Sequence, residues 1–402
     1  MIKLFYQEQL VFPSNGRSNY RIPSLVVTGN GTALAFCVDR IGSVKDNAKE
    51  MDLVYAVKKP GKQWSDVRTL DHLDGWRIDI DSAVYDSEAD KTILLFKRQP
   101  IALDEFGDYT PEEIAEHKQK EAELIQCAEE KGIFTGPCRM VSTDNGETFT
   151  EERHSVSPVM QPHLDGTEYE ITGFAHGCSH GIQLRHGKYA GRLLLPARTF
   201  IGKYTDYEQI RKCAYNNAIY SDDHGLTWKT SNCVQIGTGE GTLIELGDGS
   251  ILYNSRAYFA DGKRYLAISH DGGETYGEFS TDDFLKEEII IGCNASFLRL
   301  ELTEITDTSF LPEGAKDLVI FCNPRSDIRQ RMTACVSFDS GRTYHEAKVF
   351  YNGPCAYSSL DYDRNTGHFF LIYERGNPEK GKGPYNEGLY IAEFDLEWLL
   401  CQ

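Results

Sequence analysis

Several features that would point to other classes of protein are missing from this sequence of 402 residues. No apolar run approaches the length that crosses a bilayer, and the opening residues, MIKLFYQEQLVF, have neither a long apolar core nor a cleavage site. No stretch rich in proline, serine or charge divides the chain. These absences argue against a membrane-spanning protein and against several domains joined by linkers, so we predict one domain over residues 1–402.

Positive charge is scarce, and a disulfide framework is missing. The sequence has 42 Lys and Arg against 61 Asp and Glu, a formal net charge of -19. This charge argues against nucleic acid and anionic membranes as partners, and it requires any anionic substrate to be held by a local cluster of positive charge. The 11 cysteines are odd in number and irregularly spaced. We therefore expect free thiols and a cytoplasmic location.

What the sequence does contain is a repeated octet with the skeleton Ser-x-Asp-x-Gly-x-Thr-aromatic. The Asp carboxylate can accept bonds from turn amides, the Gly allows unusual backbone angles, and the aromatic ring packs under the hairpin. Each copy follows an apolar run that favours a β-strand. The copies are STDNGETF at 142–149, SDDHGLTW at 221–228, SHDGGETY at 269–276 and SFDSGRTY at 337–344, and PGKQW at 60–64 is either an eroded fifth copy or an ordinary turn. Repeated hairpins of this kind predict an all-β propeller.

Two segments near the edges of the repeats have distinct patterns. Residues 110–132 break the β pattern, because TPEE forms a capping box with Pro at the first helical position and Gly132 can end the helix. We predict a surface helix inserted into a blade, either inert or forming a wall or lid of the site. At the end of the chain, GLYIAEFDLEWL predicts a strand and a short helix, and we expect the strand to complete a blade begun by the N-terminus.

The octets resemble the Asp-boxes of sialidases, and further motifs occur in the sialidase order. YRIP at 20–23 precedes the octets, an NSR triplet ends at Arg256 after a Gly-rich turn, and CAYSSL spans residues 355–360. The resemblance covers the whole chain apart from the helical insert. It implies a six-bladed β-propeller and an exo-α-sialidase, which removes terminal α-linked sialic acid from oligosaccharides, glycoproteins or glycolipids with retention of configuration.

The resemblance also implies how the sugar carboxylate is bound. Arg21, Arg256 and Arg329 correspond to the three arginines that grip it, Arg40 to a further arginine of the pocket, and Glu374 to a glutamate that orients the first arginine. Arginine suits this task, because it presents a planar and permanently charged pair of donors. The alternatives for the third arginine are Arg325 and Arg331.

For catalysis the resemblance implies Tyr357 as nucleophile, Glu240 as its base and Asp46 as the acid/base, with Asp52 and Glu245 as lower-ranked alternatives to Asp46 and Glu240. A sialic acid carries its carboxylate on the anomeric carbon. An attacking Asp or Glu would bring two negative charges together, whereas a neutral Tyr deprotonated by a neighbouring Glu avoids this repulsion.

Other functions remain open at this level. A trans-sialidase or an intramolecular trans-sialidase differs only in the acceptor that completes the second step, and a non-catalytic propeller that binds glycans is a third possibility. The run His176-Gly-Cys178-Ser-His180 contains residue types that ligate zinc, but no fourth ligand stands at a sequence spacing typical of a zinc site. We expect no metal, no cofactor, no nucleic acid partner and no insertion into membranes.

Overall fold

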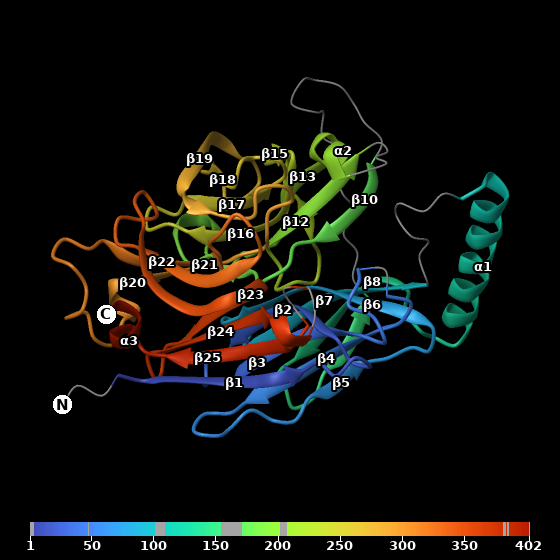
Figure 1. The fold of residues 1–402 in the computed structure, drawn as a ribbon, viewed down its shortest axis with the longest axis horizontal. Helices are drawn as coiled ribbons and strands as arrows, with labels where there is room; N and C mark the ends of the chain where they lie inside the picture. Colours follow the sequence, from blue (N-terminus) through green and yellow to red (C-terminus); the bar gives the residue numbers. More distant parts are fainter. Residues whose placement is uncertain are drawn as a thin grey trace.

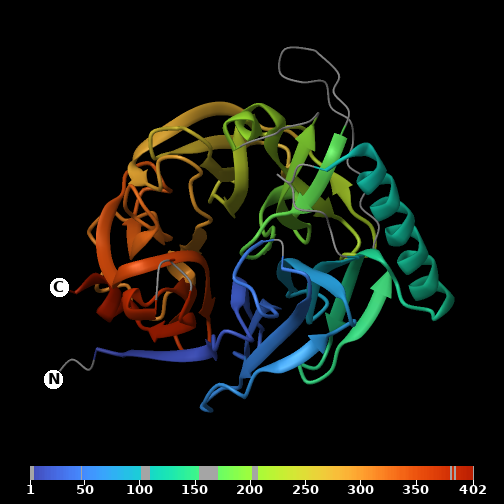
Figure 2. The ribbon, with the colours of Figure 1, turned by 45° about the vertical axis from the view of Figure 1, so that its right-hand side comes forward.

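The computed structural model describes residues 4–46, 48–100, 109–153, 171–201, 207–380, 383 and 386–401. Sheets of mostly antiparallel strands stand around a common axis, as Figure 2 shows. The prediction of an all-β propeller is confirmed, whereas the number of six blades and the extent of a single domain over residues 1–402 stay predictions. Among the described residues, no helix combines the length and the apolar character that a membrane span requires.

Residues 20–236 form two sheets. The first sheet has the order β2-β3-β4-β6-β7-β8-β9, with β5 paired to β4. Its strands are β2 (Tyr20–Val27), β3 (Ala33–Arg40), β4 (Met51–Lys58), β5 (Arg68–Asp71), β6 (Trp76–Asp86), β7 (Lys91–Pro100), β8 (Gly136–Ser142) and β9 (Thr150–Arg153). The second sheet contains β10 (Ile171–His176), β11 (Ile182–Gln183), β12 (Leu193–Ile201), β13 (Ala214–Ser221), β14 (Lys229–Thr230) and β15 (Gln235–Ile236).

The C-terminal half forms two further sheets. A meander of four strands contains β16 (Thr238–Glu245), β17 (Ile251–Ala257), β18 (Lys263–Ser269) and β19 (Gly277–Lys286). The last sheet has the order β1-β25-β24-β23-β22-β21-β20. Its strands are β20 (Ser296–Glu301), β21 (Asp317–Pro324), β22 (Gln330–Ser337), the long β23 (His345–Asp363), β24 (His368–Arg375), β25 (Gly388–Phe394) and β1 (Tyr6–Pro13).

Strand β1 joins the two ends of the chain. It pairs antiparallel with β25, so that Tyr6 lies opposite Phe394 and Pro13 lies opposite Gly388. Figure 1 shows both termini on the same side of the molecule. The prediction that the strand at 388–394 completes a blade begun by the N-terminus is confirmed, and the short helix α3 (Leu396–Leu400) follows it.

The four octets fold alike. In the octet at 221–228, the Ser221 hydroxyl donates to Asp223 at 2.8 Å and accepts the Gly225 N–H at 2.8 Å, while the other carboxylate oxygen accepts the Thr227 hydroxyl at 2.6 Å. The octets at 142–149, 269–276 and 337–344 repeat these bonds. Gly225 has a φ of 77°, in the left-handed region that favours glycine. Each octet thus closes a hairpin by side-chain bonds to its own backbone.

The apolar core lies between neighbouring sheets. Leu25 on β2 and Ile372 on β24 belong to one buried cluster, and Ile244 on β16 and Phe297 on β20 belong to another. The innermost strands meet around the axis: β2 contacts β6 and β23, and β20 contacts β16 and β23. Residues at the ends of these inner strands are therefore brought together from distant parts of the sequence.

The predicted insertion is the helix α1 (Pro111–Glu130), which connects β7 to β8. Its capping box is present, because the Thr110 hydroxyl accepts the Glu113 N–H at 3.2 Å and the Glu113 carboxylate accepts the Thr110 N–H at 2.8 Å. Ala128 is its one buried residue. Figure 1 shows α1 standing at the edge of the molecule, so the prediction of a surface helix is confirmed. The remaining helical segments are α2 (Tyr207–Cys213), η1 (Gly187–Tyr189), η2 (Leu302–Glu304) and η3 (Pro378–Lys380).

Candidate active site

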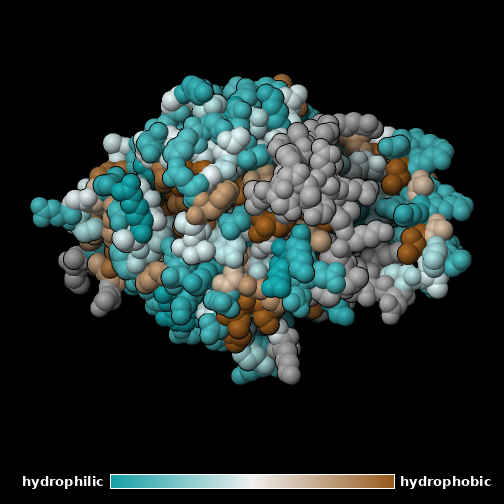
Figure 3. All heavy atoms as spheres, turned by 90° about the horizontal axis from the view of Figure 1, so that it is seen from above, coloured by the Kyte–Doolittle hydropathy of each residue, from teal (hydrophilic) through white to brown (hydrophobic). Residues whose placement is uncertain are grey.

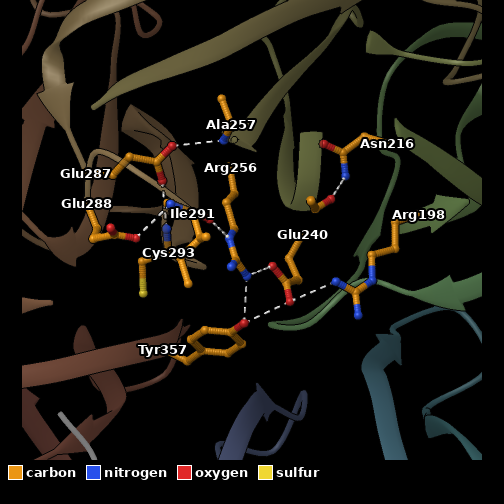
Figure 4. A network of polar contacts seen from close by, with 12 residues as sticks. Arg198, Asn216, Glu240, Arg256, Ala257, Glu287, Glu288, Ile291, Cys293 and Tyr357 are labelled. Atoms are coloured by element: carbon orange, nitrogen blue, oxygen red, sulfur yellow. Dashed lines mark hydrogen bonds and ion pairs between the residues drawn. The ribbon is translucent and has the colours of Figure 1, made fainter. Parts of the chain in front are cut away.

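Five of the predicted site residues converge at one end of the propeller axis. Arg21 lies on β2, Glu240 on β16, Arg256 on β17, Tyr357 on β23 and Glu374 on β24, and all five side chains are buried. Figure 4 shows Glu240, Arg256 and Tyr357 pointing toward one another. Charged side chains are costly to bury without partners, so their mutual contacts define the chemistry of this site.

The hydroxyl of Tyr357 is held between a carboxylate and a guanidinium group. It donates to Glu240 Oε1 at 2.8 Å and accepts a bond from Arg256 Nη1 at 2.8 Å, and the same nitrogen pairs with Glu240 Oε2. Burial raises the pKa of Tyr357 well above its usual value, Arg256 lowers it, and the charge of Glu240 raises it again. The arrangement offers the phenol proton an acceptor and the phenolate a cation.

Glu240 lies between two arginines. Arg198 Nη1 approaches Glu240 Oε1 at 3.2 Å, on the side away from Arg256 (Figure 4). Burial raises the pKa of Glu240, but Arg256 and then Arg198 hold it well below its usual range. The carboxylate is therefore ionised and able to accept a proton. Sequence reasoning missed Arg198, and the available signal was a charged residue at the end of the apolar run LLLPAR.

Glu374 connects Arg21 to the strand of the nucleophile candidate. It accepts Arg21 Nε at 2.6 Å, the backbone N–H of Ile22 at 2.9 Å and that of Tyr357 at 3.2 Å. Ile22 has a φ of 60°, which is unusual for a β-branched residue. Glu374 thus stabilises the strained backbone of β2 at Ile22, where the pairing with β3 is irregular. The Arg21 guanidinium carbon lies 5.7 Å from the centre of the Tyr357 ring.

The structure separates the three candidates for the third arginine. The guanidinium carbon of Arg329 lies 5.6 Å from the centre of the Tyr357 ring, and its Nη2 donates to the Gly292 carbonyl at 3.0 Å. Arg325 and Arg331 instead both pair with Glu346, at 3.2 Å and 2.6 Å. Of the three, Arg329 is the one placed beside the site.

A loop at residues 287–293 supplies backbone carbonyls to two of these arginines. Arg256 Nε donates to the Ile291 carbonyl at 2.5 Å, and the Gly292 carbonyl accepts from Arg329. The loop is anchored by Glu287, whose carboxylate accepts the backbone N–H groups of Ala257 at 2.9 Å and Cys293 at 3.0 Å (Figure 4). Sequence reasoning missed this loop, because carbonyl acceptors leave no trace in the side-chain pattern.

Behind the loop, Arg264 is completely buried. Its Nη1 pairs with Glu287 at 2.5 Å and donates to the Cys293 carbonyl at 2.8 Å, and its Nε donates to Asn254 at 2.7 Å. Burial raises the pKa of Glu287 and Arg264 lowers it. This buried ion pair fixes the loop that holds Arg256 and Arg329.

Asp46 and Arg40 form an ion pair at the outer edge of the site. Arg40 Nη2 lies 2.7 Å from Asp46 Oδ1, and the Asp46 side chain is 82% exposed. Arg40 Nη1 also donates to the Val44 carbonyl at 2.9 Å. Partial desolvation raises the pKa of Asp46, but Arg40 and then Arg21 hold it below its usual range, while the more distant Glu240 raises it. Asp46 is therefore a solvent-accessible carboxylate within reach of the charges of the site.

The two lower-ranked carboxylates have other partners. Asp52 lies 2.8 Å from His72 Nδ1. Glu245 accepts the backbone N–H groups of Arg185 at 2.7 Å and His186 at 3.0 Å, whereas the Tyr357 hydroxyl bonds to Glu240 and Arg256. Glu245 lines a separate cavity of about 280 Å³ with Val27 and Asp361, at the opposite ends of the inner strands.

The segment His176 to His180 contributes to the site through its cysteine. Cys178 packs against the cluster that contains Ala356, Cys293 and Tyr357. His180 is buried with its Nδ1 3.2 Å from Ser359 Oγ, and burial lowers its pKa. The side chain of His176 lies outside the described residues. Among the side chains that are described, the group spaced to hold a metal ion is Glu50, His72 and Asp74, at the surface and without Cys178 or His180.

Comparisons with known proteins give one consistent picture. The family model described as a BNR repeat-like domain matches residues 114–371. A sialidase of Micromonospora viridifaciens is 34% identical over 220 residues, which cover 54% of this chain and 30% of that protein. Sialidase-2 of Mus musculus is 26% identical over 394 residues, 93% of each chain. The match thus spans less than a third of the bacterial relative and nearly all of the mouse relative.

Solved structures agree in fold. A Hadza microbial sialidase superposes with a TM-score of 0.69 at 19% identity, covering 95% of this chain and 66% of that one. The intramolecular trans-sialidase from Ruminococcus gnavus superposes with a TM-score of 0.67 at 15% identity, covering 98% of each chain. At these identities the likeness shows the fold alone.

Proposed function

This chain belongs to the BNR repeat-like domain family, and from that premise we propose that it is an exo-α-sialidase acting on sialylated oligosaccharides, glycoproteins or glycolipids. One observation carries the proposal. The Tyr357 hydroxyl is held at 2.8 Å from both Glu240 and Arg256, with two further arginines beside the ring. A buried tyrosine paired with an ionised glutamate is the device expected for attack beside a substrate carboxylate.

The substrate carboxylate is bound by Arg21, Arg256 and Arg329 in this proposal. Their guanidinium groups surround Tyr357 and supply paired donors to a carboxylate. In the free protein, Arg256 and Arg329 donate to the carbonyls of Ile291 and Gly292, which hold the guanidinium groups in place before substrate arrives. This local positive charge also offsets the net charge of -19.

The chemical step follows from the contacts of Tyr357. Glu240 takes the phenolic proton as the phenolate oxygen bonds to the anomeric carbon, and the bond from that carbon to the leaving oxygen breaks. Asp46 gives its proton to the leaving oxygen. In the second step Asp46 takes a proton from water, the water oxygen bonds to the anomeric carbon, and Tyr357 leaves and recovers its proton from Glu240. Two displacements give retention of configuration.

Release of the fluorophore from a methylumbelliferyl α-sialoside, followed between about pH 4 and 8, tests this function directly. We expect turnover that is highest at the acidic end of this range and falls as pH rises, because Asp46 must be protonated to act as the acid and its pKa lies below the usual range. Absence of turnover, combined with measurable binding of free sialic acid, would contradict the hydrolase and favour a glycan-binding propeller.

A second candidate is an intramolecular trans-sialidase, and the structural likeness to the Ruminococcus gnavus enzyme over 98% of both chains motivates it. In that case a hydroxyl of the bound sugar, rather than water, displaces Tyr357. The mass of the released product separates the two reactions, because an anhydro sugar is lighter than the free acid by one water molecule. Detection of the free acid alone would contradict this second candidate.

The ion pair between Arg40 and Asp46 predicts a pH effect. A general acid is active when protonated, so kcat/KM falls as pH rises through its pKa. Arg40 lowers the pKa of Asp46. The substitution Arg40→Gln therefore raises that pKa, and we expect the alkaline limb of the kcat/KM profile to move to higher pH. The profile is measured with the methylumbelliferyl sialoside.

Arg77→Gln is the matched control, because Arg77 donates to the backbone carbonyl of Asp46 at 2.9 Å and not to its carboxylate. We expect this control to leave the alkaline limb in place. An unmoved limb in the Arg40 variant would show that Asp46 is not the acid.

A further inference from the structure

Three aliphatic side chains are exposed beside the proposed active site. Ile289 is 45% exposed, Ile290 49% and Ile328 59%. The two loops that carry them are joined, because the Ile289 N–H donates to the Asp327 carbonyl at 3.4 Å. We call these three residues the isoleucine platform. Single exposed apolar residues are ordinary, whereas several together on adjoining loops indicate a surface that contacts something apolar.

The platform borders the carboxylate-binding arginines. Ile291 and Gly292, which follow Ile290, accept bonds from Arg256 and Arg329, and Arg329 itself follows Ile328 in the sequence. On the loop that carries Asp46, the side chain of Val44 is a further exposed aliphatic group, while its carbonyl accepts from Arg40. Exposed apolar side chains therefore lie on the loop at 287–293, which accepts bonds from Arg256 and Arg329, and on the loop of Val44, which accepts a bond from Arg40.

The exposure of the platform is fixed by hydrogen bonds. Glu288 accepts the backbone N–H groups of Ile290 and Ile291, each at 3.0 Å, so its own side chain closes the turn. Figure 4 shows Glu288 beside Ile291. The Ile290 carbonyl accepts the Phe259 N–H at 2.7 Å. With N–H and carbonyl groups of the loop both engaged, the isoleucine side chains are held outward and not folded into the core.

An apolar surface continues from the platform toward Glu240. Ile291, Phe259 and Phe200 are partly buried and pack against one cluster, and the Arg198 guanidinium carbon lies 5.1 Å from the centre of the Phe200 ring. The face drawn in Figure 3 is mostly hydrophilic, with apolar side chains gathered in small patches. A run of apolar groups that ends at a charged site is therefore a local feature and not the general character of the surface.

We propose that the isoleucine platform binds the aglycone, and that this protein prefers sialosides with an aliphatic group near the glycosidic oxygen. The inference rests on the proposed function. In a sialoside the carboxylate and the leaving oxygen are attached to the same anomeric carbon. A surface that borders the carboxylate-binding arginines therefore also borders the path of the leaving group, and an alkyl chain placed there is removed from water against Ile290 and Ile328.

Methyl and octyl α-sialosides test this preference, with release of sialic acid as the readout. We expect kcat/KM of the wild type to be about tenfold higher for the octyl compound. The double substitution Ile290→Ser and Ile328→Ser is expected to remove the preference and to leave kcat/KM for the methyl compound unchanged. Thermal unfolding checks that the variant is folded.

Leu226→Ser is the matched control, since Leu226 is 61% exposed but lies in the octet at 221–228, outside the site. It is expected to keep the tenfold preference. An unchanged ratio of the two kcat/KM values in the double variant would overturn the proposal. The proposal would also be overturned, in favour of a membrane contact, if the wild type bound neutral lipid vesicles and the double variant lost this binding while its ratio of kcat/KM values stayed unchanged.

The two sialosides also distinguish failure of the proposed sialidase function from failure of aglycone binding by the isoleucine platform. If the wild type turns over neither sialoside, the proposed function is contradicted, and the Kd values of the two sialosides decide on the platform. A tighter Kd for the octyl compound that the double variant loses would support it, and equal Kd values would overturn it.

Discussion

Replacing Tyr357 with Phe is expected to lower kcat for an α-sialoside by about 10³-fold or more. The substitution removes only the oxygen that lies 2.8 Å from both Glu240 and Arg256. The ring that packs near Cys178 and Ala356 remains, so the fold is preserved. Turnover of the methylumbelliferyl sialoside measures the loss. The intact mass of the protein, trapped with substrate at low temperature, tests for a sialyl adduct that the variant cannot form.

Tyr253→Phe is the matched control for this experiment. Tyr253 is completely buried, and its hydroxyl donates to the Asn217 carbonyl at 2.9 Å in the core. Removing that oxygen is expected to lower the free energy of unfolding by about 1 kcal/mol and to leave kcat nearly unchanged. Retention of full activity by the Tyr357 variant would show that another group forms the covalent bond or that none is formed.

The second large effect concerns stability. Replacing Arg264 with Met is expected to lower the free energy of unfolding by about 3–5 kcal/mol, because it leaves Glu287 buried without its partner. Denaturant unfolding measures the change. Because Glu287 also holds the loop that binds Arg256 and Arg329, KM for the sialoside is expected to rise in the folded fraction of the same variant.

Arg364→Met is the control, because Arg364 makes a comparable ion pair with Glu304, at 2.7 Å, with its side chain 49% exposed. Such exposed pairs contribute little, and a loss of at most about 1 kcal/mol is expected. Equal losses in the Arg264 and Arg364 variants would mean that burial of the ion pair does not decide its contribution.

Much of the fold was predictable because its signals are local. Each octet carries the groups that close its own turn, as the bonds among Ser221, Asp223 and Thr227 show. The helix α1 likewise begins at Thr110 with a cap whose two partners are three residues apart. Local hydrogen bonds of this kind can be inferred from the residues that make them, without knowledge of the rest of the chain.

The site was predictable in its order and less so in its details. The choice between Arg329 and Arg331 could not be made from alternation, because the pairing of β22 with β23 shifts its register between Gln330 and Met332. Arg331 also has a φ of 66°. Such an irregularity changes the side on which a side chain emerges, and the sequence pattern does not record it.

Arg198 and Arg264 could not be predicted because their partners are remote. Arg198 meets Glu240 across two strands of different sheets, and Arg264 meets Glu287 on a loop beyond the next strand. A charged residue in a strand is normally expected at the surface. Only the assembled sheets show that each of these arginines pairs with a buried carboxylate.

The pairing of β1 with β25 has a consequence for the order of events on the ribosome. Residues 6–13 are translated before residues 388–394, so β1 must stay without its partner while the residues between them are synthesised. An unpaired strand edge is prone to associate with other chains. The nascent chain therefore depends most on chaperones before residues 388–394 emerge, and ring closure by the β1–β25 pairing is expected to be a late step of its folding.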